Sequence, residues 1–293
     1  MPSVSSKILY QIMKLLKFNQ ILKRDLDQHT IIGTSKKPHA HFKKVGNVDR
    51  IAISDRDVFI IKPQKEEKQT WVIYLHGGAY VHGFQSFHWR FLKTIMKKTG
   101  WNIIAPDYPL LPESSSKAMY AMIQETYQYL LDHENPKTIL FMGDSAGGGL
   151  ALGFAQWLKL EKMRTPDTII LLSPWLDVTM TDPKIKNIEP YDPILNVEAL
   201  RQIGLMLASN ENQQHYLFSP LYGDLKDIGK IFIFSGTYDL LYVDALSLSQ
   251  YLARKNITHQ LFASESMVHT FMFFGLPESN EVIKLITQAM NAM

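Results

Sequence analysis

The chain has 293 residues, of which 46% are hydrophobic and 20% charged, and its net charge is +3. This length and composition allow one large buried core and suit a single α/β domain. Because the chain has no cysteine and no run of eighteen apolar residues, disulfide and thiol chemistry are excluded and no transmembrane helix is indicated. The lack of cysteine fits a cytoplasmic protein, which is the location we expect.

The N-terminal segment is basic and has the period of an amphipathic helix. Residues 1–50 contain ten Lys or Arg against three Asp, a net charge of +7. Residues 7–24 place apolar side chains on one face and lysines on the other. The apolar face comprises Ile8, Leu9, Ile12, Met13, Leu15 and Leu16. This pattern fits a basic helix that lies on an anionic membrane, and it also fits a cap helix whose lysines are solvated.

A hairpin is expected over residues 48–62, and the strand that comes next ends in a glycine-rich loop. Residues 71–75 are apolar, β-branched or aromatic, and His76-Gly77-Gly78-Ala79-Tyr80 follows them. Glycines at a strand end let the backbone approach a ligand closely, so that its N–H groups can stabilise the oxyanion of an acyl transfer. Paired glycines also occur in ordinary βα turns, and a second motif is needed to favour the functional interpretation.

That second motif is a serine between two glycines at another strand-to-helix junction. Residues 138–142 form an apolar run, and Gly143-Asp144-Ser145-Ala146-Gly147 follows it. This is the pattern of a nucleophile elbow. The turn holds its serine in a strained conformation at a helix N-terminus, and the positions two before and two after it need to be almost free of side chains. A tight crossing with a serine N-cap would give the same pattern without chemistry.

An acid and a histidine follow in the order that such an elbow leads one to expect. Asp239 comes just after the strand-like residues 231–234, and His269 comes after the strand-like residues 260–263. His259 lies at the start or interior of a strand and is a weaker candidate. Asp244, in the first turn of the next helix, and the solvated Glu265 are the competing acids.

The histidines that precede Asp239 break this chain order, and we interpret them as surface or loop residues. They are His29, His39, His41, His82, His88, His133 and His215. His39 and His41 could form a metal-binding pair, but no Cys, Asp or Glu cluster with ligand spacing accompanies them. We therefore expect no metal site.

Strands alternate with helices along the rest of the chain. We expect strands at 71–75, 101–107, 138–142, 168–173, 230–235 and 259–264, and helices at 84–98, 115–132, 146–160, 242–255 and 278–292. This alternation predicts an α/β fold with a mostly parallel central sheet and helices on both faces. A longer insertion separates residues 173 and 230, and its segment 197–209 has a helical pattern rich in Leu, Ile and Met.

Taken together, the motifs resemble the hormone-sensitive-lipase-like branch of the α/β-hydrolases, which includes many bacterial carboxylesterases. The resemblance runs from about Asp49 to the C-terminus. It is carried by His76-Gly77-Gly78-Ala79, Asp107-Tyr108-Pro109-Leu110-Leu111-Pro112-Glu113, Gly143-Asp144-Ser145-Ala146-Gly147-Gly148, Ser173-Pro174-Trp175-Leu176-Asp177, Asp239 and His269.

Two of these motifs depart from the family pattern. Ala79 stands where the family's His-Gly-Gly-Gly has its last glycine, and it still supplies an N–H. The family's Tyr-Arg-Leu-Ala-Pro-Glu stretch lacks its arginine here, so any contact made by that arginine is absent. The resemblance implies an α/β-hydrolase catalytic domain over residues 48–293, an N-terminal cap helix region over 1–47 and a cap insertion within 178–216. It also implies that the N-terminal helix and the insertion form a lid, so we expect the apolar face of that helix to be buried.

The activity expected from this pattern is that of a serine carboxylesterase for short- to medium-chain esters. Ser145, His269 and Asp239 would act as nucleophile, general base and orienting acid. The oxyanion hole would consist of the N–H groups of Gly78, Ala79 and Ala146. An apolar pocket would be lined by Tyr80, Trp175, Leu205, Met206 and Leu207.

Two alternatives remain open at this point. The same triad could act on an amide, a formyl group or a thioester, because the motifs do not specify the leaving group. A non-catalytic receptor with the hydrolase fold could bind an apolar ligand, although such proteins typically lose a triad member. We expect a small apolar ester as substrate, no cofactor and no nucleic-acid partner. For the N-terminal helix, we favour the cap interpretation over membrane contact.

Overall fold

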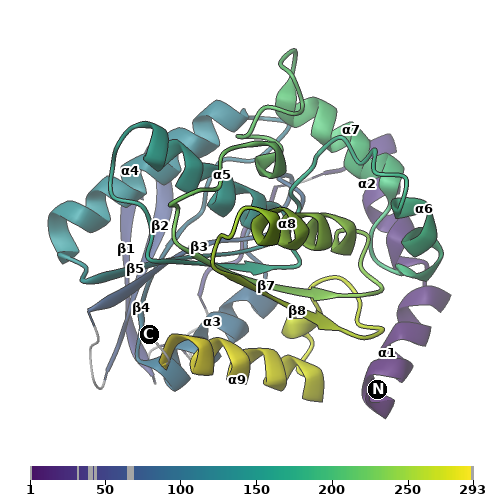
Figure 1. The fold of residues 1–293 in the computed structure, drawn as a ribbon, viewed down its shortest axis with the longest axis horizontal. Coiled ribbons are helices and arrows are strands. Elements are labelled where there is room, and N and C mark those ends of the chain that lie inside the picture. Colours follow the sequence, from purple (N-terminus) through teal and green to yellow (C-terminus); the bar gives the residue numbers. More distant parts are fainter. Residues whose placement is uncertain (1, 32, 39–41, 43–44, 65–68, 292–293) are drawn as a thin grey trace.

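The computed structural model describes residues 2–31, 33–38, 42, 45–64 and 69–291, and in this part of the chain eight strands form one sheet (Figure 1). The strands are β1 (Gly46–Ile53), β2 (Arg56–Pro63), β3 (Thr70–Leu75), β4 (Asn102–Pro106), β5 (Thr138–Asp144), β6 (Thr168–Leu172), β7 (Lys230–Gly236) and β8 (His259–Ser264). Their order in the sheet is β1-β2-β4-β3-β5-β6-β7-β8. From β4 to β8 neighbouring strands are parallel, so their carboxyl ends share one edge of the sheet.

The first two strands form the expected hairpin at one side of the sheet. Ser54 and Asp55 connect them, and both have positive φ angles of 50° and 58°. Two such residues make the turn whose twist matches that of paired strands. Strand β2 then runs antiparallel to β4 and joins the hairpin to the parallel part.

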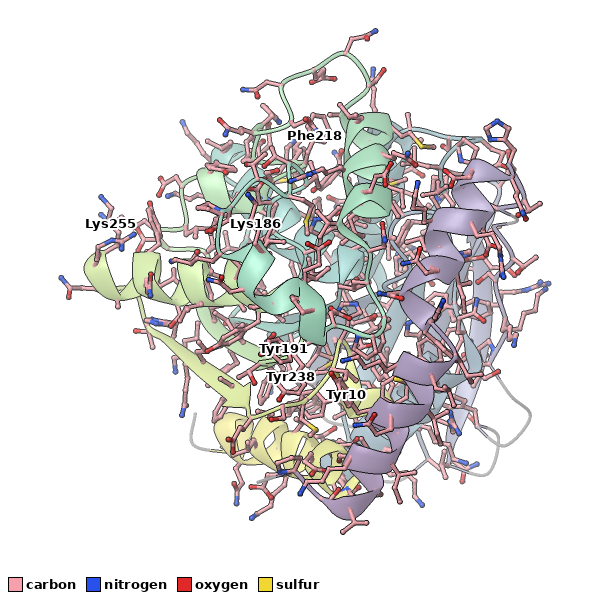
Figure 2. All side chains as sticks on the ribbon, turned by 90° about the vertical axis from the view of Figure 1, so that its right-hand side faces the viewer. Tyr10, Lys186, Tyr191, Phe218, Tyr238 and Lys255 are labelled. Atoms are coloured by element: carbon pink, nitrogen blue, oxygen red, sulfur yellow. The ribbon has the colours of Figure 1, made fainter. Side chains whose placement is uncertain are left out.

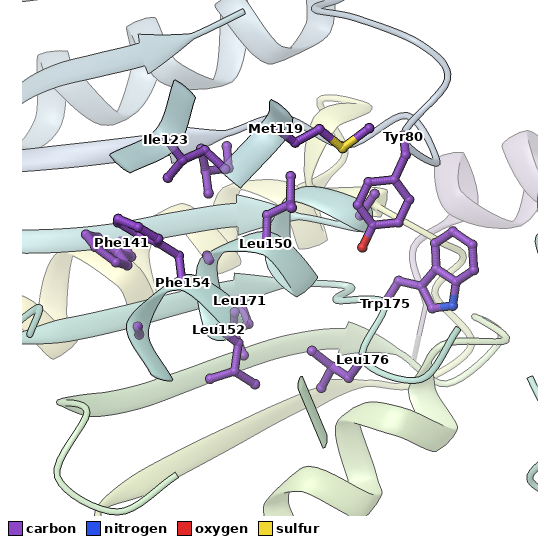
Figure 3. Packing of buried hydrophobic residues seen from close by; sticks show 14 of the residues in the cluster. Tyr80, Met119, Ile123, Phe141, Leu150, Leu152, Phe154, Leu171, Trp175 and Leu176 are labelled. Carbon is purple, nitrogen blue, oxygen red and sulfur yellow. The ribbon is translucent and has the colours of Figure 1, made fainter. Parts of the chain in front are cut away.

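Helices cover both faces of the sheet, as the sequence predicts. Figure 1 shows α4 (Ser116–Glu134), α5 (Ala146–Leu160) and α8 (Tyr242–Arg254) on one face, and α3 (Ser86–Thr99) and α9 (Pro277–Asn291) on the other. Along β3 the side chains alternate between two buried clusters, with Ile73 on the α5 side and Val72 on the α3 side. A strand buried on both faces is continuously apolar for this reason. Figure 3 shows part of the larger cluster, in which Phe141 of β5 packs against Phe154 of α5.

The N-terminal segment differs from the single helix predicted over residues 7–24. It consists of α1 (Val4–Leu15), the 3₁₀ turn η1 (Phe18–Gln20) and α2 (Ile21–Asp27). The chain changes direction at Lys17, whose φ of 50° is left-handed and cannot continue a helix. Helix α1 therefore ends at Leu15, nine residues before the predicted end at residue 24.

The expected burial of the apolar face of this segment is also wrong for most of its residues. Ile8 is 56% exposed, Ile12 48%, Leu15 82% and Leu16 59%, whereas Met13 is buried. Only one edge of the predicted face points inward, where Met13 and Leu9 pack against the core on the α3 and α9 side. The amphipathic pattern groups the right residues, but it does not say which face meets the protein.

The segment between β6 and β7 contains four helical elements, of which the 3₁₀ turn η4 (Pro220–Tyr222) is the last, and it lies beside the N-terminal segment. Helix α6 (Ile185–Ile188), the 3₁₀ turn η3 (Glu189–Tyr191) and α7 (Val197–Ala208) follow one another, and α7 contacts α2. A salt bridge of 3.2 Å joins Lys23 of α2 to Glu198 of α7. Among the described residues, no helix is long and apolar enough to cross a bilayer.

Candidate active site

The junction of β5 and α5 has the geometry of a nucleophile elbow. Ser145 lies between them with φ 51° and ψ −122°, a conformation that non-glycine residues rarely adopt. A Cβ atom at Gly143 would lie 2.2 Å from the carbonyl oxygen of Gly147, and one at Gly147 would lie 2.0 Å from that of Leu75. The need for glycine at both positions is thus confirmed. The turn places Ser145 at the carboxyl edge of the sheet and at the N-terminus of α5, where the helix dipole favours negative charge.

An aspartate and a histidine meet at the same edge. Asp239 follows β7, His269 follows β8, and the His269 Nδ1 and Asp239 Oδ2 atoms are 3.0 Å apart. Both side chains are buried, and the N–H of Leu241 donates to the other oxygen of Asp239. Of the competing acids, Asp244 instead accepts the N–H groups of Leu176 and Asp177, and Glu265 is exposed.

The end of β6 connects Ser145 to this pair. The N–H of Ser145 donates to Leu172 O at 2.9 Å, and the hydroxyl of the next residue, Ser173, accepts the N–H of Thr270 at 3.1 Å. Within the described part of the chain, the Ser145 hydroxyl donates to no side chain. In enzymes without substrate such hydrogen bonds are often long and shorten in the Michaelis complex.

The environment of His269 favours its protonated form. Burial lowers the pKa of the imidazole, but the charge of Asp239 and the hydrogen bond with it outweigh burial, and the charge of Asp192 acts in the same direction. The pKa of His269 is therefore raised above its ordinary value. A raised pKa makes the imidazole a stronger base. Because Nδ1 faces Asp239, Nε2 is the nitrogen that can take a proton.

The glycine-rich loop after β3 turns through three consecutive residues with positive φ. These are Gly78 at 122°, Ala79 at 52° and Tyr80 at 62°. Successive N–H groups in such a turn point into one concavity, which suits an anionic oxygen. In the part of the chain that the structure describes, the N–H groups of Gly78, Ala79 and Ala146 donate to no protein acceptor. Ala146 is the first residue of α5, so its N–H is one of those that a helix leaves unpaired.

Asp144, inside the elbow motif, connects the elbow to this loop. Its carboxylate accepts Tyr74 Oη at 2.5 Å and the N–H of Gly77 at 3.0 Å, and it lies 3.4 Å from His88 Nε2. Although burial opposes ionisation, His88 and these hydrogen bonds hold the pKa of Asp144 below its ordinary value. The interpretation of His88 as a surface or loop residue is wrong, because it is a buried residue of α3 whose ring reaches Asp144.

His76 shapes the start of the same loop. It is fully buried and its ring stacks on Tyr108 at a centroid distance of 4.1 Å. The hydroxyl of Tyr108 donates to His76 O at 2.5 Å, and His76 Nδ1 lies 2.8 Å from Gly77 O. Burial, and then the neighbouring His88, lower the pKa of His76 to about 3, so this imidazole is neutral.

Sequence reasoning missed Asp192, a buried carboxylate from the insertion. One of its oxygens accepts the N–H groups of Ile194 and Leu195, and the other accepts the N–H of Leu240 at 2.7 Å. Leu240 directly follows Asp239, so this contact connects the insertion to the loop of the candidate acid. Burial, and then the charge of Asp239, raise the pKa of Asp192 to about 7. The Asp192-Pro193 dipeptide is a sequence signal for a turn with a bonded carboxylate, but Asp182-Pro183 in the same insertion gives the same signal.

The residues expected to line the pocket differ in how far their side chains are buried. The rings of Tyr80 and Trp175 are buried 5.5 Å apart (Figure 3), and Leu207 is buried. Met206 is half-buried, but Leu205 is 58% exposed, so its side chain does not support a lining role. No group of three or more His, Cys, Asp or Glu side chains suited to a metal ion occurs among the described residues. His39 and His41 lie outside them.

Comparison with known proteins agrees with this geometry. Residues 72–273 match the model of a family with the alpha/beta hydrolase fold. An esterase of Acinetobacter venetianus is 28% identical over 241 residues, which cover 78% of this chain and 76% of that protein. An acetyl-hydrolase of Streptomyces hygroscopicus is 26% identical over 228 residues, covering 77% and 76%.

Solved structures share the fold over nearly the whole length. A crystal structure of an esterase from the bacterial hormone-sensitive lipase family superposes with a TM-score of 0.81 at 24% identity and covers 98% of both chains. The chain therefore belongs to the α/β-hydrolase family whose model it matches, a family in which the relatives above are named as an esterase and an acetyl-hydrolase.

Proposed function

We propose that this protein is a serine carboxylesterase in which Ser145, His269 and Asp239 form the catalytic triad. His269 Nε2 takes the proton of the Ser145 hydroxyl as its oxygen attacks the ester carbonyl, and later gives that proton to the leaving alcohol. Asp239 orients the imidazole through Nδ1 and stabilises its cation. A water molecule then attacks the acyl-enzyme by the same route and releases the acid.

The observation that carries this proposal is the strained elbow at Ser145 beside a buried His269–Asp239 pair. A plain strand-to-helix crossing has no need of a histidine and an acid at the same edge. The unpaired N–H groups of Gly78, Ala79 and Ala146 support a role as oxyanion hole, in which loss of one donor typically costs about a hundredfold or more in rate. The carboxylate of Asp144 accepts the N–H of Gly77 and so holds the glycine-rich loop in a fixed position relative to the elbow.

We propose short- to medium-chain esters as substrates. The relatives are named as esterases and acetyl-hydrolases, and the candidate lining residues Tyr80 and Trp175 are aromatic without a charged group as anchor. We further propose that the N-terminal region, residues 1–47, and the insertion within 178–216 together cover this site. The contact of α2 with α7 and the Lys23–Glu198 salt bridge support that arrangement.

The leaving group is tested with a matched pair of substrates that carry the same acyl group. The p-nitrophenyl ester and the p-nitroanilide of butyric acid release related chromophores and differ only in the scissile bond. We expect kcat/KM to be higher for the ester by several orders of magnitude. Comparable or faster turnover of the anilide would favour the amidase alternative, and no turnover of either substrate would favour a receptor.

A further inference from the structure

Helix α1 is held against the protein in a defined orientation. At its N-terminus, Glu278 of α9 accepts the N–H of Ser3 at 2.5 Å and the hydroxyl of Ser6 at 2.7 Å. Further along, Met13 is buried, and the ring of Tyr10 lies 5.5 Å from that of Tyr238. These contacts fix which side of the helix faces inward.

The opposite side of α1 exposes a stripe of large apolar side chains. Val4 is 73% exposed, Ile8 56%, Ile12 48% and Leu15 82%. At 3.6 residues per turn these four positions span about 80° of the helix circumference. Seven of the eleven large apolar side chains that are exposed in the described chain lie between residues 4 and 21. Single exposed apolar residues are ordinary, but a contiguous stripe on one helix indicates a binding surface.

The charges beside this stripe are all positive. Lys7 and Lys14 are exposed on one flank of it, Lys17 follows the end of the helix, and residues 4–24 contain no Asp or Glu. Contact with a second copy of the same face would bring these lysines together without any acid to pair them, which is unfavourable. A surface of anionic lipid satisfies both features, because it offers negative headgroups to the lysines and an acyl boundary to the apolar stripe.

We infer that α1 docks the protein onto anionic lipid surfaces, with the stripe of Val4, Ile8, Ile12 and Leu15 entering the headgroup region and Lys7, Lys14 and Lys17 contacting the headgroups. The helix lies next to the candidate site, because Tyr10, Tyr191 of η3 and Tyr238 form one aromatic cluster (Figure 2), and Tyr238 directly precedes Asp239. Docking through α1 thus brings the carboxyl edge of the sheet close to the lipid, where apolar esters are concentrated. The inference goes beyond the proposed activity and does not depend on it.

The test is co-sedimentation with vesicles of equal parts phosphatidylglycerol and phosphatidylcholine, and with vesicles of phosphatidylcholine alone. We expect the wild-type protein to bind the anionic vesicles and to bind the neutral ones far more weakly. Binding should weaken as salt rises from about 0.01 M to about 1 M, a range over which the Debye length falls from about 30 Å to about 3 Å. The double variant I8Q/L15Q should lose about tenfold or more of this binding, since both side chains leave the apolar phase.

Matched control variants test whether binding depends on this surface rather than on any exposed apolar side chain or any surface lysine. Leu160 is 59% exposed at the end of α5, so L160Q removes a comparable side chain and should bind as the wild type does. Lys14 lies over the ring of Tyr10 at 5.6 Å and Lys255 over that of Tyr251 at 6.0 Å, so K14Q should weaken binding and K255Q should not.

The same variants must remain folded for the comparison to count. Thermal unfolding followed by circular dichroism reports this, and we expect the Tm to be unchanged in I8Q/L15Q, because the replaced side chains face solvent. Wild-type protein that fails to bind anionic vesicles would overturn the inference, as would full binding by I8Q/L15Q. A wild-type dimer that I8Q/L15Q converts to monomer would also overturn it and would assign the stripe to contact between copies.

Discussion

At the scale of single residues, some of the side chains at the candidate site could be placed from the sequence and others could not. The positions of Ser145, Asp239 and His269 at the carboxyl edge of the sheet could be predicted, because each follows a recognisable strand and parallel strands end at one edge. The contact of His88 could not be predicted, because it depends on a carboxylate in a distant motif, although the spacing of His88 from Leu92 and Ile95 places it on the buried face of α3. The same holds for Asp192, which acts on the loop of Asp239 from the insertion.

The charge of Asp239 should set the acidic limb of the pH profile. His269 must be neutral to act as a base, and its raised pKa places the wild-type limb above the ordinary histidine value of 6.5. In Asp239→Asn the loss of the carboxylate charge lowers the pKa of His269, so the limb of kcat/KM should move to lower pH while kcat falls by about 10⁴-fold. The measurement is a pH series of ester hydrolysis.

Asp244→Asn is the matched control for this prediction. Its carboxylate binds the N–H groups of Leu176 and Asp177 rather than the imidazole, so the variant can lower stability but should leave the acidic limb in place. A limb that moves in Asp244→Asn and stays in Asp239→Asn would reverse the assignment of the acid.

At the scale of elements, the contact between the insertion and the β7–α8 loop has a consequence for stability. The pKa of Asp192 is raised from 3.8 to about 7, so the folded chain keeps a proton that the unfolded chain loses in this window. Its contribution to folding is fully present below pH 3.8 and is lost as the pH rises through 7.

We therefore expect the free energy of unfolding to fall less steeply between pH 4 and 7 in Asp192→Asn than in the wild type. Denaturant titrations at several pH values measure this slope. The amide lacks one of the two acceptors, so the variant will be less stable overall, and the slope alone is the test. An unchanged slope would show that Asp192 does not hold this proton.

The elements themselves follow the sequence closely except near the N-terminus. Helix α5 has the predicted bounds of residues 146–160, and β8 those of 259–264. The break at Lys17 was not predictable, because neither glycine nor proline marks it and the packing of α1 and α2 on different parts of the protein imposes it. The face of α1 that meets the protein was missed for a related reason, since helical period groups residues without saying what they contact.

At the scale of the whole molecule, the fold class and the family could be predicted from the motifs and their order along the chain, and the substrate range could not. The expected lining residues Leu205 and Met206 show why, because their exposure depends on how the insertion packs, which the sequence does not specify. The structure corrects one of these, because Leu205 is largely exposed.

A series of p-nitrophenyl esters should reveal the acyl limit of the site. Each methylene buried in an apolar pocket contributes about 0.8 kcal/mol, so kcat/KM should rise severalfold per carbon from acetate toward medium chains and then fall once the pocket is full. Emulsified long-chain triglycerides should be poor substrates. Efficient hydrolysis of such emulsions would instead make the protein a true lipase.

The central claim, that Ser145 is an activated nucleophile, is tested most directly by covalent labelling with a fluorophosphonate followed by mass spectrometry of the peptides. The account predicts a single modified residue, Ser145, with labelling lost in Ser145→Ala at nearly unchanged thermal stability and strongly slowed in His269→Ala. Labelling at another serine, or wild-type protein that remains unlabelled while it hydrolyses esters, would contradict it.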